Sequence, residues 1–128
     1  MLEYGELKKP FLAPPASLFP IAWSILYLLM GVGAALVYTK DTQNDENRKL
    51  GIIFHLIQLI LNFFWSIIFF NAREYLLAFV WLILLWLSVM SMLINYSKVS
   101  KTAFFLNVPY LVWLTFAAYL NLAVFILN

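Results

Sequence analysis

Four side chains near the C-terminus place aromatic, small and polar groups within an otherwise apolar stretch. Tyr110, Trp113, Ala117 and Asn121 follow one another at spacings of three, four and four residues. At about 100° per residue, these positions fall within roughly an 80° arc of one helix face. Aromatic rings, a small side chain and a polar amide on one face can together hold a flat apolar molecule, by stacking and by hydrogen bonding. We therefore predict that this face lines an interior and does not meet lipid.

A second polar stripe lies in an apolar stretch in the middle of the chain. His55, Gln58, Asn62 and Ser66 project within about 80° of one another on a helix, with Trp65 at the edge of the arc. Because polar groups in hydrocarbon are costly without partners, this stripe should face the interior of a helix bundle. A lone histidine is more often a hydrogen-bonded structural residue than a ligand, so we predict no metal site.

The first apolar stretch also presents an aromatic face, formed by Phe19, Trp23, Tyr27, Met30 and Ala34. Aromatic stripes at helical spacing occur both in ordinary membrane packing and in pocket walls. The sequence leaves these two interpretations open.

The chain lacks the residue sets on which conventional enzymes depend. It contains no cysteine and one histidine, and it has no paired carboxylates, Ser-His-Asp set or glycine-rich phosphate loop. Hydrolytic or phosphoryl-transfer chemistry therefore has no residues to use, and we predict no catalytic residue. The formal net charge of +2, without a basic run, gives no reason to expect a nucleic-acid partner.

Long apolar segments must position these side chains. Hydrophobic residues make up 65% of the chain and charged residues 11%, far from the soluble globular range. Each apolar segment between the charged clusters can cross a hydrocarbon core of roughly 30 Å as a helix. We predict an all-α integral membrane protein, one domain over residues 1–128, with transmembrane helices at about 18–38, 50–71, 75–95 and 102–127.

The flanking and connecting segments carry weaker signals. Successive prolines in residues 1–17 favour an extended segment along the membrane surface, followed by an N-cap at Ser17. Gly31 and Ala35 form a small-xxx-small pair suited to close helix contact. Residues 39–49 are rich in mixed charges, and we predict a solvated loop there.

Three blocks of this sequence resemble the translocator protein family, also called TspO/MBR, the tryptophan-rich sensory proteins or the peripheral benzodiazepine receptors. The first block comprises Lys9-Pro10, Pro14-Pro15, Trp23, Leu26-Tyr27 and Met30-Gly31. The second comprises Gln58, Asn62, Trp65-Ser66 and Phe69-Phe70. The third comprises Pro109-Tyr110, Trp113, Phe116-Ala117 and Leu120-Asn121. Their order and spacing agree with the family over nearly the whole chain.

The resemblance implies a known fold with one departure. Family members have five transmembrane helices, and the four expected here match helices two to five. Either the start codon was placed late or this is a four-helix variant, in which a second copy or a lipid would replace one wall of the family's pocket. The family usually has a Trp-Tyr pair where this chain has Glu3-Tyr4, and a Trp where it has Leu12.

The resemblance also implies a function. Family members bind tetrapyrroles such as porphyrin or haem, or other flat apolar ligands such as sterols, and act as sensors, regulators or translocators. Carried over to this chain, the ligand-binding residues are Trp23, Tyr27, Asn62, Trp65, Tyr110, Trp113, Ala117 and Asn121. No covalently bound cofactor is implied. Some bacterial relatives degrade bound porphyrin in light and oxygen, so the resemblance permits such an activity through Trp23 and Trp113 and leaves enzyme status open.

Two other functions remain open at this stage. A small dimeric exporter has four helices but relies on an acidic residue in its first helix, and none lies between Ser17 and Tyr38. A structural membrane subunit would use the aromatic faces to bind a partner helix. The expected partners are membrane lipid, a tetrapyrrole or sterol-like molecule and a second copy of the chain. The Lys-, Asn- and Ile-rich composition favours a bacterial plasma membrane.

Membrane orientation also stays open. Lys and Arg are more frequent in 39–49 and 96–101 than in the other polar segments, which weakly favours a cytoplasmic location for these two loops. The arrangement known for the family implies the opposite orientation.

Overall fold

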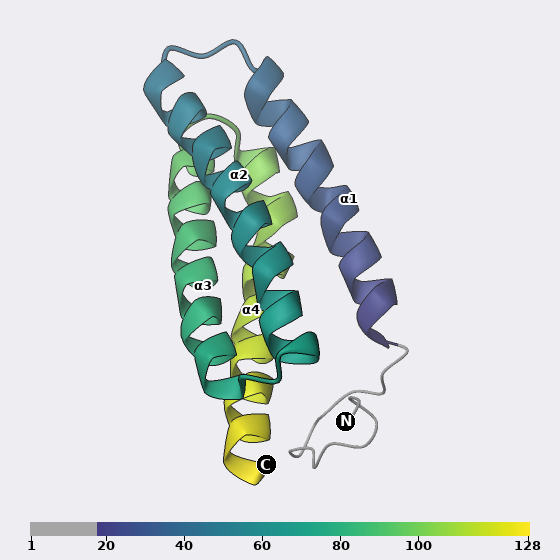
Figure 1. Cartoon of the computed structure of the whole chain (residues 1–128). Helices are drawn as coiled ribbons and strands as arrows, with labels where there is room; N and C mark the ends of the chain where they lie inside the picture. Colours follow the sequence, from purple (N-terminus) through teal and green to yellow (C-terminus); the bar gives the residue numbers. More distant parts are fainter. Residues whose placement is uncertain (1–17) are drawn as a thin grey trace.

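A computed structural model describes residues 18–128, which form a bundle of long helices (Figure 1). The predictions for residues 1–17, including the N-cap at Ser17, lie outside the described residues. The elements are α1 (Leu18–Thr39), α2 (Asp45–Ser66), the π-helical turn η2 (Ile67–Asn71) that continues α2, α3 (Tyr75–Ser97) and α4 (Lys101–Leu127). The four spans are long and apolar enough to cross a membrane, and no strand occurs in 18–128. The predicted all-α integral membrane fold is confirmed.

Short connections make consecutive helices run antiparallel. α3 packs against both α2 and α4, whereas α1 packs mainly against α4 and less extensively against α2 (Figure 1). α1 therefore lies at the outside of the bundle and is the helix with the fewest neighbours to hold it. It carries no charged side chain from Leu18 to Thr39.

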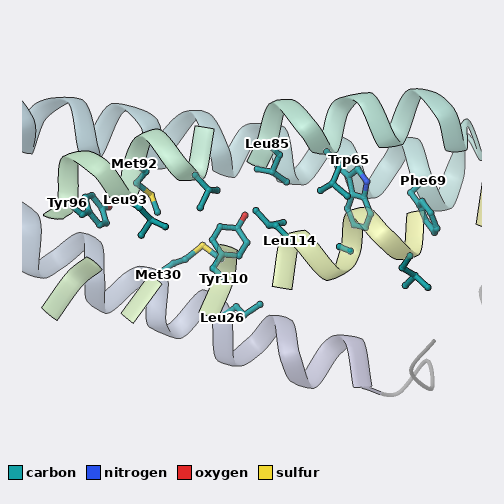
Figure 2. Close-up of a cluster of buried hydrophobic side chains, with 14 of the residues drawn as sticks. Leu26, Met30, Trp65, Phe69, Leu85, Met92, Leu93, Tyr96, Tyr110 and Leu114 are labelled. Atoms are coloured by element: carbon teal, nitrogen blue, oxygen red, sulfur yellow. The ribbon is translucent and has the colours of Figure 1, made fainter. Parts of the chain in front are cut away.

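The core contains apolar side chains from every helix (Figure 2). The largest share comes from α3, whose buried residues are Ala78, Leu82, Leu85, Val89, Met92, Leu93, Asn95 and Tyr96. Equally apolar side chains cover the outside, where Leu28 and Phe105 are each 67% exposed. In a membrane protein the outer surface is as apolar as the interior. The buried face of each helix therefore differs from its lipid-facing side by contact with neighbouring helices and not by hydrophobicity.

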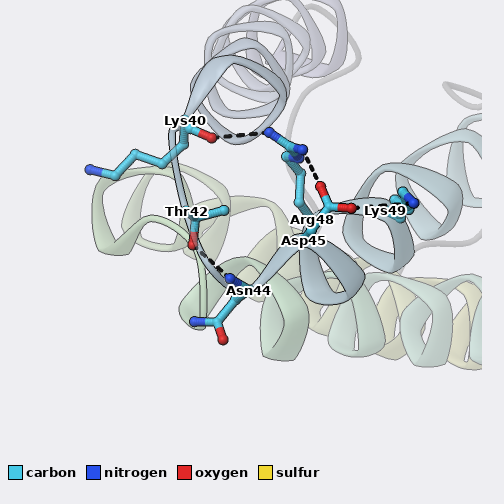
Figure 3. A network of polar contacts seen from close by, with 6 residues as sticks. All are labelled: Lys40, Thr42, Asn44, Asp45, Arg48 and Lys49. Carbon is cyan, nitrogen blue, oxygen red and sulfur yellow. Dashed lines mark hydrogen bonds and ion pairs between the residues drawn. The ribbon is translucent and has the colours of Figure 1, made fainter.

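α2 begins at Asp45, earlier than the predicted start at about residue 50, and residues 45–49 are helical where we expected loop. Asp45 and Glu46 occupy the first turn, where carboxylates interact favourably with the helix dipole. Asp45 also pairs with Arg48 and with Lys49, whose Nζ lies 3.2 Å from Asp45 Oδ2 (Figure 3). These contacts stabilise a charged helical turn that a purely apolar criterion misses.

The close contact between α1 and α4 occurs at Gly33 and not at the predicted Gly31 and Ala35, which are both exposed. A Cβ atom on Gly33 would lie 2.3 Å from Asn107 Nδ2, whereas one on Gly31 would meet nothing within 4 Å. The predicted close contact through Gly31 and Ala35 is therefore wrong. Gly33 is the residue that allows α1 and α4 to approach each other closely.

Candidate functional site

α1, α2 with η2, and α4 surround a small cavity with aromatic walls. We call it the aromatic cavity, and its lining residues are Phe19, Trp23, Trp65, Phe69, Phe70, Trp113, Phe116, Ala117, Leu120 and Asn121. Its volume is about 20 Å³, close to the room that one water molecule needs. In this conformation the lining side chains of different helices contact one another, so little space remains between them.

Ring contacts hold these walls together. Trp113 on α4 meets Trp23 edge to face, with ring centroids 6.2 Å apart, and meets Phe19 in the same way at 5.9 Å. On α2 and η2, Trp65 and Phe69 stack at 5.4 Å. Edge-to-face and offset-stacked pairs are the favourable aromatic arrangements. Contacts between rings thus close the N-terminal half of α1 against α4.

A chain of hydrogen bonds ties α1, α2 and α4 together. Tyr27 OH donates to Asn62 Oδ1 at 3.1 Å, and Asn62 Nδ2 donates to Tyr110 OH at 2.8 Å. Tyr110 OH then donates to Gln58 Oε1 at 2.6 Å. We call Tyr27, Asn62, Tyr110 and Gln58 the polar chain. The last three are buried, so each amide and hydroxyl satisfies another where water is excluded.

His55 lies at one end of the polar chain. It is half-buried, and its Nδ1 lies 3.2 Å from Gln58 Nε2. This contact agrees with the structural role that we predicted for the histidine. Across residues 18–128, no group of three or more His, Cys, Asp or Glu side chains could hold a metal ion.

Asn121 has both halves of its amide occupied, although it lines the aromatic cavity. Its Oδ1 accepts a hydrogen bond from Trp65 Nε1 at 3.1 Å, and its Nδ2 donates to the Tyr75 carbonyl at 2.8 Å. These bonds join α4 to α2 and to the start of α3. Asn121 therefore ties helices together and fixes the ring of Trp65 in the cavity wall.

Trp113 is the cavity residue with an unmet hydrogen-bonding group. Its Nε1 atom is buried and has no hydrogen-bond partner among the described residues. An unpaired buried donor costs about 1–3 kcal/mol. Within residues 18–128, the indole N–H of Trp113 is therefore a buried donor without a partner.

The structure divides the eight predicted site residues into two groups. Five line the aromatic cavity, namely Trp23, Trp65, Trp113, Ala117 and Asn121. The other three, Tyr27, Asn62 and Tyr110, belong to the polar chain, and the Tyr27 side chain remains 45% exposed. Ser66 is exposed, so its predicted place on the interior stripe is wrong.

Half of the cavity wall lies outside the predicted ligand-binding set. The residues in question are Phe19, Phe69, Phe70, Phe116 and Leu120, and Gln58 completes the polar chain. The sequence had placed Phe19 on an aromatic helix face and Gln58 on the interior stripe, without assigning either to the site. The occurrence of Phe69-Phe70, Phe116 and Leu120 in the family blocks was the signal that could have identified the others.

Comparison with known proteins identifies the family of this chain. The sequence profile described as the TspO/MBR family matches residues 2–127. The chain is 39% identical over 125 residues to "Tryptophan-rich protein TspO" of Chlorobaculum tepidum, and 40% identical over 125 residues to "Protein CrtK" of Rhodobacter capsulatus. Each alignment covers 98% of this chain and 78% of the relative.

A more distant relative extends the similarity to animals. The chain is 35% identical over 121 residues to the human protein named "Translocator protein", an alignment that covers 94% of this chain and 72% of the relative. The family match spans both the cavity wall and the polar chain. This chain belongs to the TspO/MBR family.

Proposed function

We propose that this membrane protein binds a tetrapyrrole, such as protoporphyrin or haem, or another flat apolar ligand such as a sterol, in the aromatic cavity. The observation that carries the proposal is the meeting of Trp23, Trp65 and Trp113, from three helices, around one cavity. Flat macrocycles bind to aromatic plates by offset stacking, with a few polar groups to orient them. The unpaired Nε1 of Trp113 would donate to a ligand acceptor.

Binding requires the cavity to open. A volume of about 20 Å³ is far below the roughly 300–1,000 Å³ of pockets that hold drug-sized ligands. α1 is the wall that can move at least cost, because it packs mainly against α4 and its ring contacts are weak individually. In this proposal the ligand replaces the Trp23–Trp113 and Phe19–Trp113 contacts with its own ring contacts.

The experiment measures protoporphyrin binding to the purified full chain by the shift of the porphyrin Soret band. This signal belongs to the ligand, so removing a tryptophan does not change the probe. We expect the double variant Trp23→Phe, Trp113→Phe to weaken binding at least about tenfold, because it replaces two indole rings by smaller phenyl rings and removes the unpaired donor of Trp113. Circular dichroism checks that the variant remains helical.

Trp86→Phe is the matched control. Trp86 Nε1 donates to Thr115 Oγ1 at 3.0 Å between α3 and α4, outside the aromatic cavity. Its loss should leave porphyrin affinity unchanged. Equal porphyrin affinity in the wild type, the double variant and Trp86→Phe would contradict the proposal. If the double variant kept its porphyrin affinity but lost association with a partner helix, a structural subunit would be favoured.

The finer biological setting belongs to the same proposal. We place the protein in a bacterial plasma membrane, on its composition, and as a homodimer, on the family resemblance. The name of the human relative suggests that a bound ligand is also moved across or within the membrane, and light-dependent degradation of porphyrin through Trp23 and Trp113 remains a hypothesis. Absorbance of the bound porphyrin under illumination, with and without oxygen, tests the last point.

A further inference from the structure

A groove lies at the end of the bundle opposite the aromatic cavity, where α1 ends and α2 begins. It has a volume of about 550 Å³ and is lined by Tyr38, Arg48, Lys49, Ile52 and Ile53. We call it the cationic groove. Because the span of α1 ends at Thr39 and that of α2 starts at Asp45, the groove lies at the depth of lipid headgroups.

The two cations of the groove are held in place. Arg48 donates to the Lys40 carbonyl at 3.1 Å and pairs with Asp45, and Lys49 pairs with the same carboxylate at 3.2 Å (Figure 3). One carboxylate between two cations leaves one positive charge. Arginine has five N–H donors and lysine three, so both side chains retain donors for a second anion.

Among residues 18–128, positive charge accumulates at the groove end of the bundle. Asn44 Nδ2 donates to the Lys98 carbonyl at 2.8 Å, which brings the α3–α4 turn beside the α1–α2 loop. Among the described residues, this end holds Lys40, Arg48, Lys49, Lys98 and Lys101 against Asp41, Asp45 and Glu46. In the same described range, the turn between η2 and α3 at the other end holds Arg73 and Glu74, whose charges are opposite. The net charge at the groove end is therefore positive.

The rest of the groove is apolar and leads into the membrane. Tyr38 is 71% exposed and Ile53 is 49% exposed, and the next exposed residues on α2 are Leu56, Ile57 and Ile60. An anion that uses only the cations would leave this surface unoccupied. A molecule with an anionic head and hydrocarbon chains fits both parts, because aromatic and apolar residues below a basic rim match headgroup and chain.

We propose that the cationic groove is a binding site for an anionic phospholipid, with the phosphodiester on Arg48 and Lys49 and an acyl chain along Ile52 and Ile53. The site is separate from the aromatic cavity, so the proposal of lipid binding does not depend on the proposal of tetrapyrrole binding. The lipid would fix the end of α1 against α2 while leaving the aromatic half of α1 free to move.

The experiment counts lipids bound to the full chain by native mass spectrometry in a neutral detergent, with phosphatidylglycerol, phosphatidylcholine or inorganic phosphate added. We expect preferential binding of phosphatidylglycerol. Arg48→Gln with Lys49→Gln should weaken that binding about tenfold or more, because it removes the two charged groups of the groove that would donate hydrogen bonds to the phosphodiester. The matched control, Lys98→Gln with Lys101→Gln, removes the same charge from the same end and should retain most of the affinity.

A third variant separates lipid binding from a purely structural role of the ion pairs. Asp45→Asn breaks the same pairs as the double variant but raises the positive charge of the groove. We expect Asp45→Asn to tighten phosphatidylglycerol binding while the double variant weakens it. Equal weakening by both variants would overturn the proposal. So would equal loss in the Lys98 and Lys101 control, or competition by inorganic phosphate at concentrations similar to those of the lipid.

Discussion

At the scale of the residue, the hydroxyl of Tyr110 has the most demanding position. It accepts from Asn62 and donates to Gln58, and the Tyr110 side chain is 1% exposed. A single oxygen atom thus satisfies two buried amides in a region without water. The sequence predicted that Asn62 and Tyr110 face inward, because polar groups in hydrocarbon need partners. It could not show that they are partners of each other, since spacing along one helix says nothing about register between helices.

Tyr110→Phe should therefore destabilise the fold. The change retains the ring but removes the partner of Asn62 Nδ2 and of Gln58 Oε1, which costs about 1–3 kcal/mol. Unfolding of the purified protein by dodecyl sulfate in mixed micelles gives the free energy of unfolding. The control is Tyr38→Phe, whose side chain is 71% exposed. A loss for Tyr110→Phe no larger than that for Tyr38→Phe would show that the polar chain does not contribute to stability.

At the scale of the element, the helices differ in how well their sequences predict their buried faces. The buried face of α4 could be predicted because Tyr110, Ala117 and Asn121 share one side of the helix, and all three are buried. The buried face of α3 could not be predicted, because apolar residues occur on all sides of this helix and the packing of α2 and α4 decides which of them are buried. Serine residues do not mark the buried face of α3, because Ser88 and Ser91 donate to carbonyls of their own helix and so need no partner on another helix.

The junction of α1 and α4 gives a prediction at this scale. Gly33→Ala should destabilise the bundle by about 1–3 kcal/mol, because the new methyl group would displace buried Asn107 and disturb its 2.9 Å bond to the Ala103 carbonyl. Gly31→Ala is the matched control in the same helix, with nothing within 4 Å of the added Cβ. It should be neutral or stabilising by up to about 1 kcal/mol, from helix propensity.

Thermal unfolding in detergent, followed by circular dichroism, compares the two glycine variants. Equal melting temperatures for Gly33→Ala and Gly31→Ala would mean that α1 and α4 do not approach closely at Gly33. A lower melting temperature for Gly31→Ala alone would point back to the small-xxx-small pair that the structure replaces.

At the scale of the whole molecule, the helices form a packed unit of α2, α3 and α4 with α1 applied to one side. If ligand binding opens the aromatic cavity, α1 should move at its N-terminal half and stay in place at the cationic groove. Spin labels at Leu18→Cys and Leu122→Cys, both partly exposed, report the end where α1 begins and α4 ends. The chain has no cysteine of its own, so labelling needs no background changes.

We expect protoporphyrin to lengthen the distance between the labels at Leu18 and Leu122, measured by pulsed electron paramagnetic resonance. A second pair, Thr39→Cys with Lys101→Cys, reports the opposite end, where both residues are exposed, and should not change. A lengthening at both ends would mean that α1 leaves the bundle as a whole. No change at either end, with porphyrin bound, would place the ligand outside the aromatic cavity.

The uncharged character of α1 has an electrical consequence. Moving one elementary charge across a membrane potential involves about 2.3 kcal/mol per 100 mV. α1 carries no formal charge from Leu18 to Thr39, so its displacement transports no gating charge through the field. The opening proposed for the aromatic cavity would therefore move no side-chain charge of this helix through the membrane potential, and it should depend far more on ligand, packing and lipid than on voltage.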